Sequence, residues 1–360
     1  MSVIIFLAVL SILVIVHEWG HYITAKLLGV KVEKFSMGFG KKLFSRMHNG
    51  TEFMVCAIPL GGYVKMAGDE RASCAGNKEE FFSHPVRDRA LIVLMGPIIN
   101  FLFAYICFYL VCIAGYPTLL PKVGKIMAGY PAQVAGFQIE DRVVQIDEKP
   151  ITSWEDLQQY VAHSSGPLKF LILRNGEKMA VGVIPQERVV KNLFGKEEKV
   201  RLIGVSPKDE VTLMRYGIGE SFGKAAELLI KNITLTLQGL YYVVTGVMPA
   251  KEALGGPIRI FGFIRDAATM GFSYLVFVMA IISLNLAIFN LFPIPVLDGG
   301  HLFFFAIEGI RKKPISLKVE DLLTKVGLSL LMCLMIFVLY NDVMEVGWID
   351  SIKKAVHKIK

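Results

Sequence analysis

Two histidines and a glutamate follow an apolar run near the start of the chain. Residues 17–21 read H-E-W-G-H, and residues 3–16 before them are almost entirely apolar. On a helix, positions i and i+4 share one face, so His17 and His21 can both reach one cation. Glu18 lies one residue along, where it would act as a base on water beside the metal and not as a ligand.

The residues around this pattern indicate whether it is a functional metal site or a fortuitous match. A pattern of this length also occurs on ordinary helices, where it has no function. Beside hydrocarbon, however, ionisable side chains are costly, and a cluster of them is functional by default. We therefore predict a metal site with His17 and His21 as ligands and Glu18 as the general base.

A third ligand must come from elsewhere in the chain, because a catalytic zinc takes three protein ligands and leaves one position for water. Asp298 is the candidate, since it lies in the proline- and glycine-rich stretch 293–301 that follows a later apolar run. Irregular chain at membrane depth is tolerated only where it lines a buried site. The alternative is an aspartate that only caps a turn. For His301, packing or support behind a ligand is the preferred role.

The composition indicates a protein that crosses a bilayer several times. Of its 360 residues, 54% are hydrophobic and 19% charged, which is too apolar for an ordinary soluble protein. Residues 3–28, 90–114, 272–292 and 322–340 are the apolar runs that predict helical spans. The net charge of +8 fits cytoplasmic loops and lipid headgroups, and no nucleic-acid partner is expected. The five cysteines lack the paired spacing of disulfides or of a cysteine-ligated zinc site.

The distribution of basic residues predicts the orientation of the first span. No basic residue precedes Lys26, and several lysines follow it, so the N-terminus is expected outside and the metal motif in the cytoplasmic half of the membrane. The missing basic n-region favours a retained span over a signal peptide. Four spans also place the lysine-rich tail, residues 353–360, outside, against the same rule. The side of the tail therefore stays open.

The fold class predicted from these runs is a polytopic α-helical membrane protein with about four transmembrane helices and an inserted small α/β domain. We divide it into an N-terminal membrane part (1–115), the α/β domain (116–186), a linker with an amphipathic helical segment (187–271) and a C-terminal membrane part (272–360). Within the α/β domain, Ser153 and Asp156 resemble a capping box that opens a helix. The Asn175-Gly176 pair predicts a hairpin turn.

Two features of the N-terminal part leave alternatives open. Residues 52–58 and 63–66 have strand composition around the turn residues 59–62, which fits a β-hairpin against the membrane and a polar loop equally well. Asn100 interrupts the second apolar run and needs a partner there, either on another helix or at the metal site.

Three motifs taken together resemble a known family. Residues 17–21, Asn290-Leu291-Phe292-Pro293 and the L-D-G-G-H of residues 297–301 resemble the bacterial site-2 proteases, which are intramembrane zinc metalloproteases. The regulator-of-sigma-E protease type is the most similar, with further matches at residues 35–40, 59–66 and 95–100.

The resemblance implies roles for particular residues. Zinc is the expected cofactor, with His17, His21 and Asp298 as ligands and Glu18 as the base. Asn290 is expected to bind the substrate backbone or stabilise the oxyanion. The hairpin with Gly61, Gly62 and Tyr63 resembles the family's membrane-associated β-loop, which is thought to hold substrate as an added strand.

The resemblance also implies partners and a location. Residues 116–186 resemble a PDZ domain through Gly129-Tyr130-Pro131-Ala132 and Asp141-Arg142-Val143. The best-known type carries two such domains, but only one fits here. The implied function is regulated intramembrane proteolysis in the bacterial cytoplasmic membrane, with the N-terminus and the PDZ-like domain extracytoplasmic.

The expected substrates are single-span membrane proteins, such as anti-sigma factors, or signal-peptide remnants after an earlier extracytoplasmic cut. The PDZ-like domain would exclude bulky substrates or bind a substrate peptide, such as a newly exposed C-terminus. One alternative is a non-catalytic membrane scaffold that presents this domain. The presence of Glu18 argues against it, because a structural metal site needs no base. A metal transporter would need repeat symmetry among its spans, which the sequence lacks.

Overall fold

The computed structural model describes residues 2–71, 74–192, 194–253 and 255–345, so the predicted basic tail lies outside the described residues. The chain divides into two compact units. The first comprises Met1–Leu110, Phe222–Gln238 and Ala250–Lys360, and the second Val111–Ser221 and Gly239–Pro249.

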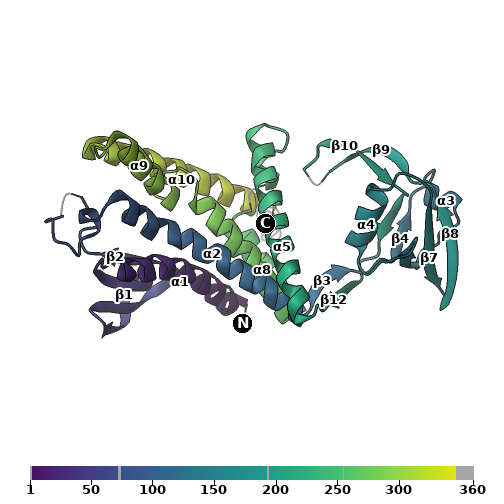
Figure 1. Ribbon diagram of the computed structural model, residues 1–360, viewed down its shortest axis with the longest axis horizontal. Helices are drawn as coiled ribbons and strands as arrows, with labels where there is room; N and C mark the ends of the chain where they lie inside the picture. Colours follow the sequence, from purple (N-terminus) through teal and green to yellow (C-terminus); the bar gives the residue numbers. More distant parts are fainter. Residues whose placement is uncertain (1, 72–73, 193, 254, 346–360) are drawn as a thin grey trace, which may run out of the picture. The chain divides into compact units, whose positions relative to one another are not determined.

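Four helices in the described part of the chain are long and apolar enough to cross a membrane (Figure 1). They are α1 (Ser2–Leu27), α2 (Val86–Ala114), α8 (Phe272–Asn290) and α10 (Leu317–Glu345). All four coincide with predicted apolar runs. The helices α2 and α10 begin before those runs, because helical hydrogen bonding continues through the charged residues in their first turns.

The first helix packs against other elements at several points along its length. Val9 and Leu13 are buried in one cluster with Ile264 of α7 (Pro257–Met270). Further along, Gly20 lies against α2, where a Cβ would be 2.3 Å from the Met95 carbonyl oxygen. Only glycine permits this approach, and it brings α2 beside the metal motif.

The predicted β-hairpin is present as β1 (Val32–His48) and β2 (Thr51–Met66), which pair antiparallel. Residues 34–37 of β1 lie opposite both 52–55 and 62–65 of β2. Residues 62–66 therefore form one edge of this small sheet. Ser11 of α1 donates a hydrogen bond to the Pro59 carbonyl (3.3 Å), which holds the hairpin against the first helix.

Shorter helices complete the first unit. The sequence predicted only irregular chain over residues 293–301, whereas the structure starts a helix there, with Leu297 as the N-cap residue. Within the predicted amphipathic segment, residues 218–244 form one long helix. These elements are η1 (Phe81–Ser83), α5 (Ile218–Val244), α6 (Ala250–Ala253) and α9 (Asp298–Arg311).

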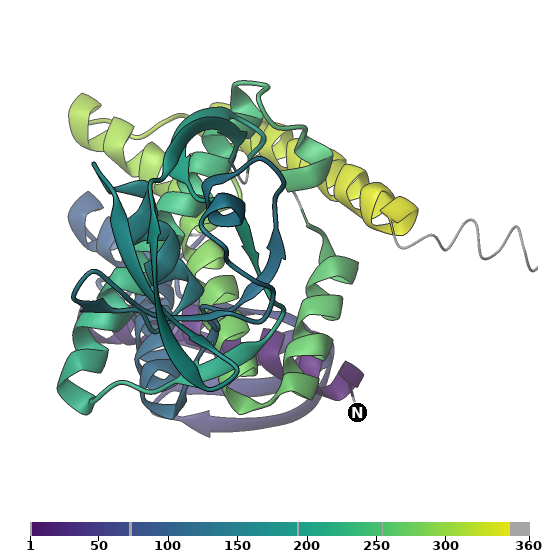
Figure 2. The same ribbon diagram turned by 90° about the vertical axis from the view of Figure 1, so that its right-hand side faces the viewer.

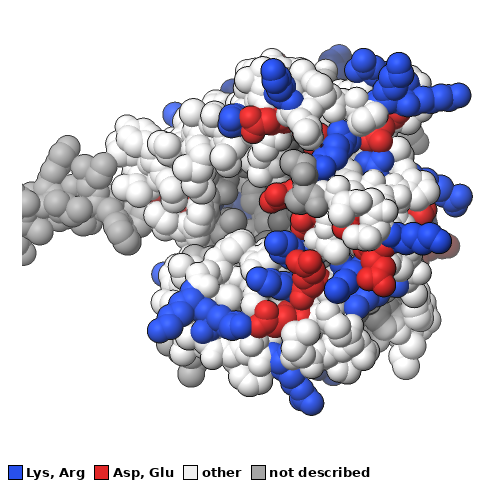
Figure 3. Space-filling view, turned by 90° about the vertical axis from the view of Figure 1, so that its left-hand side faces the viewer, with Lys and Arg blue, Asp and Glu red and all other residues white. Residues whose placement is uncertain are grey.

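Charged side chains of both signs gather on one face, on the side where Figure 1 labels β1, β2 and α9 (Figure 3). Within the hairpin, ion pairs join Lys42 with Glu52 at 2.5 Å and Lys65 with Glu33 at 3.9 Å. A charged rim of this kind suits the boundary between hydrocarbon and water.

The second unit is a small α/β domain built around a four-stranded sheet of order β6-β5-β7-β8 (Figure 2). Trp154, Phe170 and Ile172 lie in its core. The predicted capping box is confirmed at the start of α4, and the predicted Asn175-Gly176 hairpin joins β7 to β8. The elements are β3 (Tyr116–Leu119), β4 (Val123–Ile126), α3 (Pro131–Val134), β5 (Arg142–Ile146), β6 (Lys149–Pro150), α4 (Trp154–Ala162), β7 (Leu168–Arg174), β8 (Glu177–Val183), β9 (Gln186–Lys191), β10 (Glu197–Leu202), β11 (Val205–Pro207) and β12 (Val211–Met214).

The predicted boundary at residue 186 falls inside this unit. Strand β11 pairs with β4, and β12 pairs with β3, so residues taken as linker return to the start of the domain. The chain enters and leaves the domain through these paired strands. Just beyond them, the Tyr216 amide donates to the Cys112 carbonyl (3.0 Å).

Candidate metal centre

The two histidines of α1 are buried and already spaced for a shared metal ion. His17 and His21 are 9% and 8% exposed, and their ring centroids lie 4.9 Å apart. Their Nε2 atoms are 3.3 Å apart. Two nitrogens at tetrahedral positions about 2.0–2.1 Å from zinc are separated by about 3.3 Å. The helical spacing therefore produces the ligand geometry directly.

Asp298, the first residue of α9, reaches the same point from the far end of the sequence. Its Oδ2 lies 3.1 Å from His17 Nε2, and its Oδ1 lies 3.6 Å from His21 Nε2. The three ligand atoms lie within 4.8 Å of one another, and the described residues contain no second group of this kind. Asp298 Oδ2 is buried and accepts no hydrogen bond from any residue that the structure describes, so it suits a cation.

The second nitrogen of each imidazole faces α2. His21 Nδ1 lies 2.9 Å from the Ile92 carbonyl oxygen, which can only accept, so Nδ1 carries the proton and Nε2 is left free for a metal. His17 Nδ1 lies 3.1 Å from the side-chain amide of Asn100. The role of the Ile92 carbonyl could not be found from the sequence, because a backbone acceptor leaves no signal in residue type.

The base candidate lies between the histidines and the hairpin. The backbone of Val64 on β2 lies beside the Glu18 carboxylate. A Cβ on Gly62 would lie 2.7 Å from the Ser36 carbonyl oxygen and 3.5 Å from Glu18 Cγ. The edge strand thus runs directly beside Glu18, and a glycine is required at position 62 because a Cβ there would clash with the Ser36 carbonyl oxygen.

Of the other predicted substrate-binding residues, Asn290 lies at the metal centre, whereas Gly61 and Tyr63 lie against Phe39. Asn290, at the end of α8, has its Nδ2 3.4 Å from His17 Nε2, inside the metal centre. Tyr63 instead stacks on Phe39, with ring centroids 6.2 Å apart, and Gly61 also lies against the Phe39 ring. Of the three hairpin residues, Gly62 is the one that faces the base.

His301 does not join the ligand group. Its ring packs edge-on against Phe304, with centroids 6.5 Å apart, and it is absent from the cluster formed by His17, His21 and Asp298. This agrees with the packing role preferred from the sequence.

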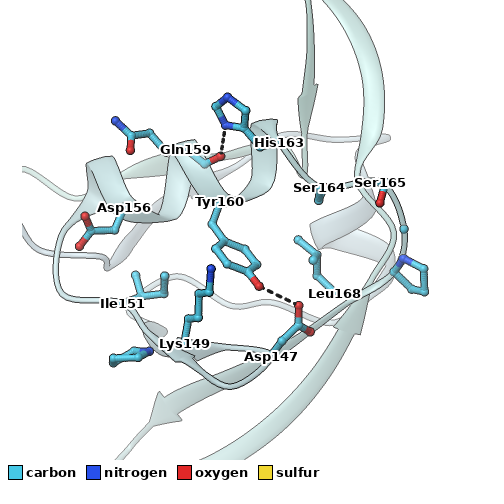
Figure 4. Close-up of a pocket in the computed structure, with 13 residues that line it drawn as sticks. Asp147, Lys149, Ile151, Asp156, Gln159, Tyr160, His163, Ser164, Ser165 and Leu168 are labelled. Carbon is cyan, nitrogen blue, oxygen red and sulfur yellow. Dashed lines mark hydrogen bonds between the residues drawn. The ribbon is translucent and has the colours of Figure 1, made fainter. Parts of the chain in front are cut away.

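A separate cavity of about 740 Å³ lies in the α/β domain, between α4 and the turn after β5 (Figure 4). Tyr160 donates to Asp147 (3.2 Å), and His163 Nδ1 donates to the Gln159 carbonyl (2.8 Å). Burial, together with the Asp147 carboxylate, raises the pKa of Tyr160. These polar groups already bond one another, so we assign no chemistry to them.

Comparisons with known proteins extend over nearly the whole chain. The model of peptidase family M50 matches residues 5–334. "Putative zinc metalloprotease Cj1068" of Campylobacter jejuni is 35% identical over 342 residues, which cover 94% of this chain and 92% of that protein. "Putative zinc metalloprotease CA_C1796" of Clostridium acetobutylicum is 37% identical over 350 residues, covering 95% and 97%.

Among solved structures, the PDZ domain of an SdrC-like protein from Listeria monocytogenes matches 24% of this chain and 86% of its own length. Its sequence identity is 14% and its TM-score 0.20. The family is established by the sequence matches alone. Because the family model covers residues 5–334, which include His17, His21 and Asp298, and the relatives align over more than nine-tenths of both chains, this chain belongs to peptidase family M50.

Proposed function

We propose that this chain is an intramembrane zinc endopeptidase of the site-2 type. The single observation that carries the proposal is the meeting of His17, His21 and Asp298, whose ligand atoms come within 4.8 Å although α1 and α9 are far apart in sequence. Zinc is the metal because relatives at 35% and 37% identity are named zinc metalloproteases, and two imidazoles with one carboxylate are a catalytic zinc set.

The membrane assignment rests on the helices that carry the site. The cluster lies on α1 and beside α2 and α8, each apolar enough to span a bilayer. We place the chain in a bacterial cytoplasmic membrane, with the N-terminus and the α/β domain outside and the metal centre toward the cytoplasm. The lysines after α1 and the charged face of Figure 3 support this orientation.

The chemistry follows from the positions of three groups. When bound, zinc supplies a Lewis acid that lowers the pKa of water and polarises a carbonyl. Glu18 accepts the proton of the attacking water and later gives it to the departing amine. We propose that the Val64 backbone amide, which lies beside the Glu18 carboxylate, holds it in place. We propose that the Asn290 amide, whose Nδ2 lies 3.4 Å from His17 Nε2, donates to the oxygen on which negative charge develops.

The hairpin provides a way to hold an opened substrate. A peptide bond inside a membrane helix is hydrogen-bonded and shielded from water, so the helix must unwind before it is cut. Residues 62–66 form a sheet edge beside Glu18, and we propose that the unwound segment adds to this edge as a strand. Exposed apolar side chains on the hairpin, Leu43, Phe44 and Met47, suit contact with lipid.

The α/β domain is proposed to select substrates. It resembles a PDZ domain in sequence, and its compact core supports independent recognition of a peptide or exclusion of a bulky domain. The proposed substrates are single-span membrane proteins or signal-peptide remnants that an earlier protease has shortened. We propose the same regions as from the sequence, except that the α/β domain continues beyond residue 186 to residue 214, because β11 and β12 pair with β4 and β3.

The decisive experiment compares Glu18→Gln with the intact protein on a single-span substrate whose extracytoplasmic domain has been removed. Cleavage should fall by about 10²- to 10⁴-fold, because the base is lost. Bound zinc, measured by atomic absorption, should be unchanged. Glu33→Gln is the matched control, since Glu33 is a half-exposed carboxylate whose ion pair with Lys65 is long, at 3.9 Å. Full activity of Glu18→Gln would remove the catalytic assignment.

A further inference from the structure

Asn100 is an amide side chain buried completely among the membrane-spanning helices. It lies on α2 with 0% of its surface exposed. Its Nδ2 is 3.1 Å from His17 Nδ1, and its Oδ1 has no hydrogen-bond partner among the described residues. A buried polar atom without a hydrogen-bond partner destabilises the protein, so such an atom among apolar helices indicates a functional role.

The imidazole of His17 can bind a metal through Nε2 only in one tautomer. The proton must then sit on Nδ1 and be donated to an acceptor. His21 meets this need through the Ile92 carbonyl, 2.9 Å from its Nδ1. For His17, the group within reach of Nδ1 is the Asn100 amide, at 3.1 Å.

The two ends of this amide select opposite tautomers. With Nδ2 toward the ring, Asn100 donates to Nδ1 and leaves the ring proton on Nε2, where it competes with a metal. Rotating the amide by half a turn presents Oδ1 instead, which accepts from Nδ1 and frees Nε2. We propose that Asn100 is a positioning residue that sets the metal-binding tautomer of His17 through an Nδ1–H···Oδ1 hydrogen bond.

The backbone of Asn100 is anchored separately from its amide. Ser283 of α8, itself fully buried, donates its hydroxyl to the Asn100 carbonyl oxygen at 2.9 Å. The side chain can therefore rotate about its last bond while its backbone stays fixed between α1 and α8. Because Ser283 contacts the backbone carbonyl and not the side-chain amide, a Ser283 variant changes helix packing at Asn100 without changing the hydrogen bond to His17.

The inference rests on the proposed zinc ligands, and its test measures zinc affinity in the purified full-length protein by competition with a chelator. Asn100→Leu keeps the volume but offers no acceptor, and zinc binding should weaken by about 10- to 100-fold. Asn100→Asp keeps an acceptor and should bind zinc at least as tightly as the intact protein. Cobalt-loaded Asn100→Asp should also keep the visible absorption spectrum of the intact protein.

Two controls isolate the hydrogen bond from packing. Ser283→Ala removes the helix contact to the same residue and should leave the zinc affinity unchanged. Asn285→Leu removes an amide from a span at a position that bonds Thr236 (2.9 Å), away from the metal centre, and should also leave it unchanged. If Asn100→Leu does not fold, Asn100→Ala against Asn100→Asp gives the same comparison.

The outcomes separate this inference from the proposed function. Zinc binding that survives His17→Ala overturns the ligand set itself. Zinc binding that is lost in His17→Ala but normal in Asn100→Leu overturns only the role of Asn100. Equal weakening in Asn100→Leu and Asn100→Asp also overturns it, since the acceptor then has no effect.

Discussion

Gly96 of α2 lies against the His21 imidazole of α1, so closely that a Cβ at position 96 would be 2.4 Å from His21 Nε2. The same Cβ would lie 2.9 Å from the His17 ring. The absence of a side chain at one position of the second span therefore makes room for both proposed ligands.

The variant Gly96→Ala should weaken zinc binding at least about tenfold, because the added methyl group pushes the His21 ring out of position. Loss of a group that supports a metal ligand has an effect of this size on metal affinity. Chelator competition measures the change. Gly309→Ala on α9 is the matched control, since a Cβ there meets no atom within 4 Å. Normal zinc affinity in Gly96→Ala would show that the two helices can separate without cost.

Removing the Asp298 carboxylate should weaken zinc binding by more than about 100-fold in Asp298→Ala, because a direct ligand contributes more than a supporting group. Zinc content after dialysis against a weak chelator gives the result. His301→Ala, three residues along the same helix, should keep its zinc, since the His301 ring packs on Phe304 outside the cluster. The reverse result would move the third ligand to His301.

The Asn290 amide is expected to act on the reaction and not on metal binding. In Asn290→Ala, kcat should fall by about 10²- to 10³-fold, the usual effect of removing one donor to a developing oxyanion. Zinc content should stay constant. Asn285→Ala, one helical turn or more away on α8, should retain normal kcat. A fall in zinc content in Asn290→Ala would instead make Asn290 part of the ligand support.

A largely buried ion cluster links Glu308 of α9 to Arg71 and Arg89. Glu308 accepts from Arg89 at 2.7 Å and from Arg71 at 3.0 Å, and the Arg89 side chain is only 5% exposed. Glu308→Gln should lower the free energy of unfolding by about 3–5 kcal/mol, because it leaves buried charge uncompensated. Thermal unfolding in detergent measures the loss. The exposed pair of Lys325 and Asp321 is the control, and Asp321→Asn should change stability by less than about 1 kcal/mol.

The capping box of α4 predicts a pH dependence. Burial alone would raise the pKa of Asp156, but hydrogen bonds from Thr152 and Ser153 outweigh it and lower the pKa below 3.8. A carboxyl whose pKa is lower when folded stabilises above its unfolded pKa, and that stability is lost as the pH falls through the folded pKa. At neutral pH, Asp156→Asn should therefore be about 1 kcal/mol less stable than the intact protein.

The difference between the two proteins should shrink as the pH falls below 3.8, where the unfolded carboxyl is already protonated. Thermal unfolding of the full-length protein at several pH values tests this. Glu148→Gln, an exposed carboxyl in the neighbouring turn, controls for general acid effects. A gap between Asp156→Asn and the intact protein that stays constant down to pH values below 3.8 would contradict the assignment.

Much of the architecture follows from the sequence, because membrane helices and helix caps are local. The four apolar runs correspond to α1, α2, α8 and α10, and the capping box at Ser153 opens α4 as predicted. Pairing between distant strands is not local. The pairing of β11 with β4 and of β12 with β3 was not predicted, because the sequence of residues 205–214 does not indicate that they pair with residues 116–126.

The metal centre, too, has some features that follow from local sequence and others that depend on tertiary packing. By itself, the sequence determined that His17 and His21 share one face of a helix and that Glu18 lies next to them, because helical periodicity fixes those positions. Only the tertiary structure decided that Asp298 reaches that face, that Asn290 and Asn100 flank His17, and that Gly62 lies beside Glu18 while Tyr63 turns to Phe39. These relations depend on how separate helices and a strand edge pack, and packing is set by the approach of backbones at glycines such as Gly20 and Gly96, which residue spacing does not encode.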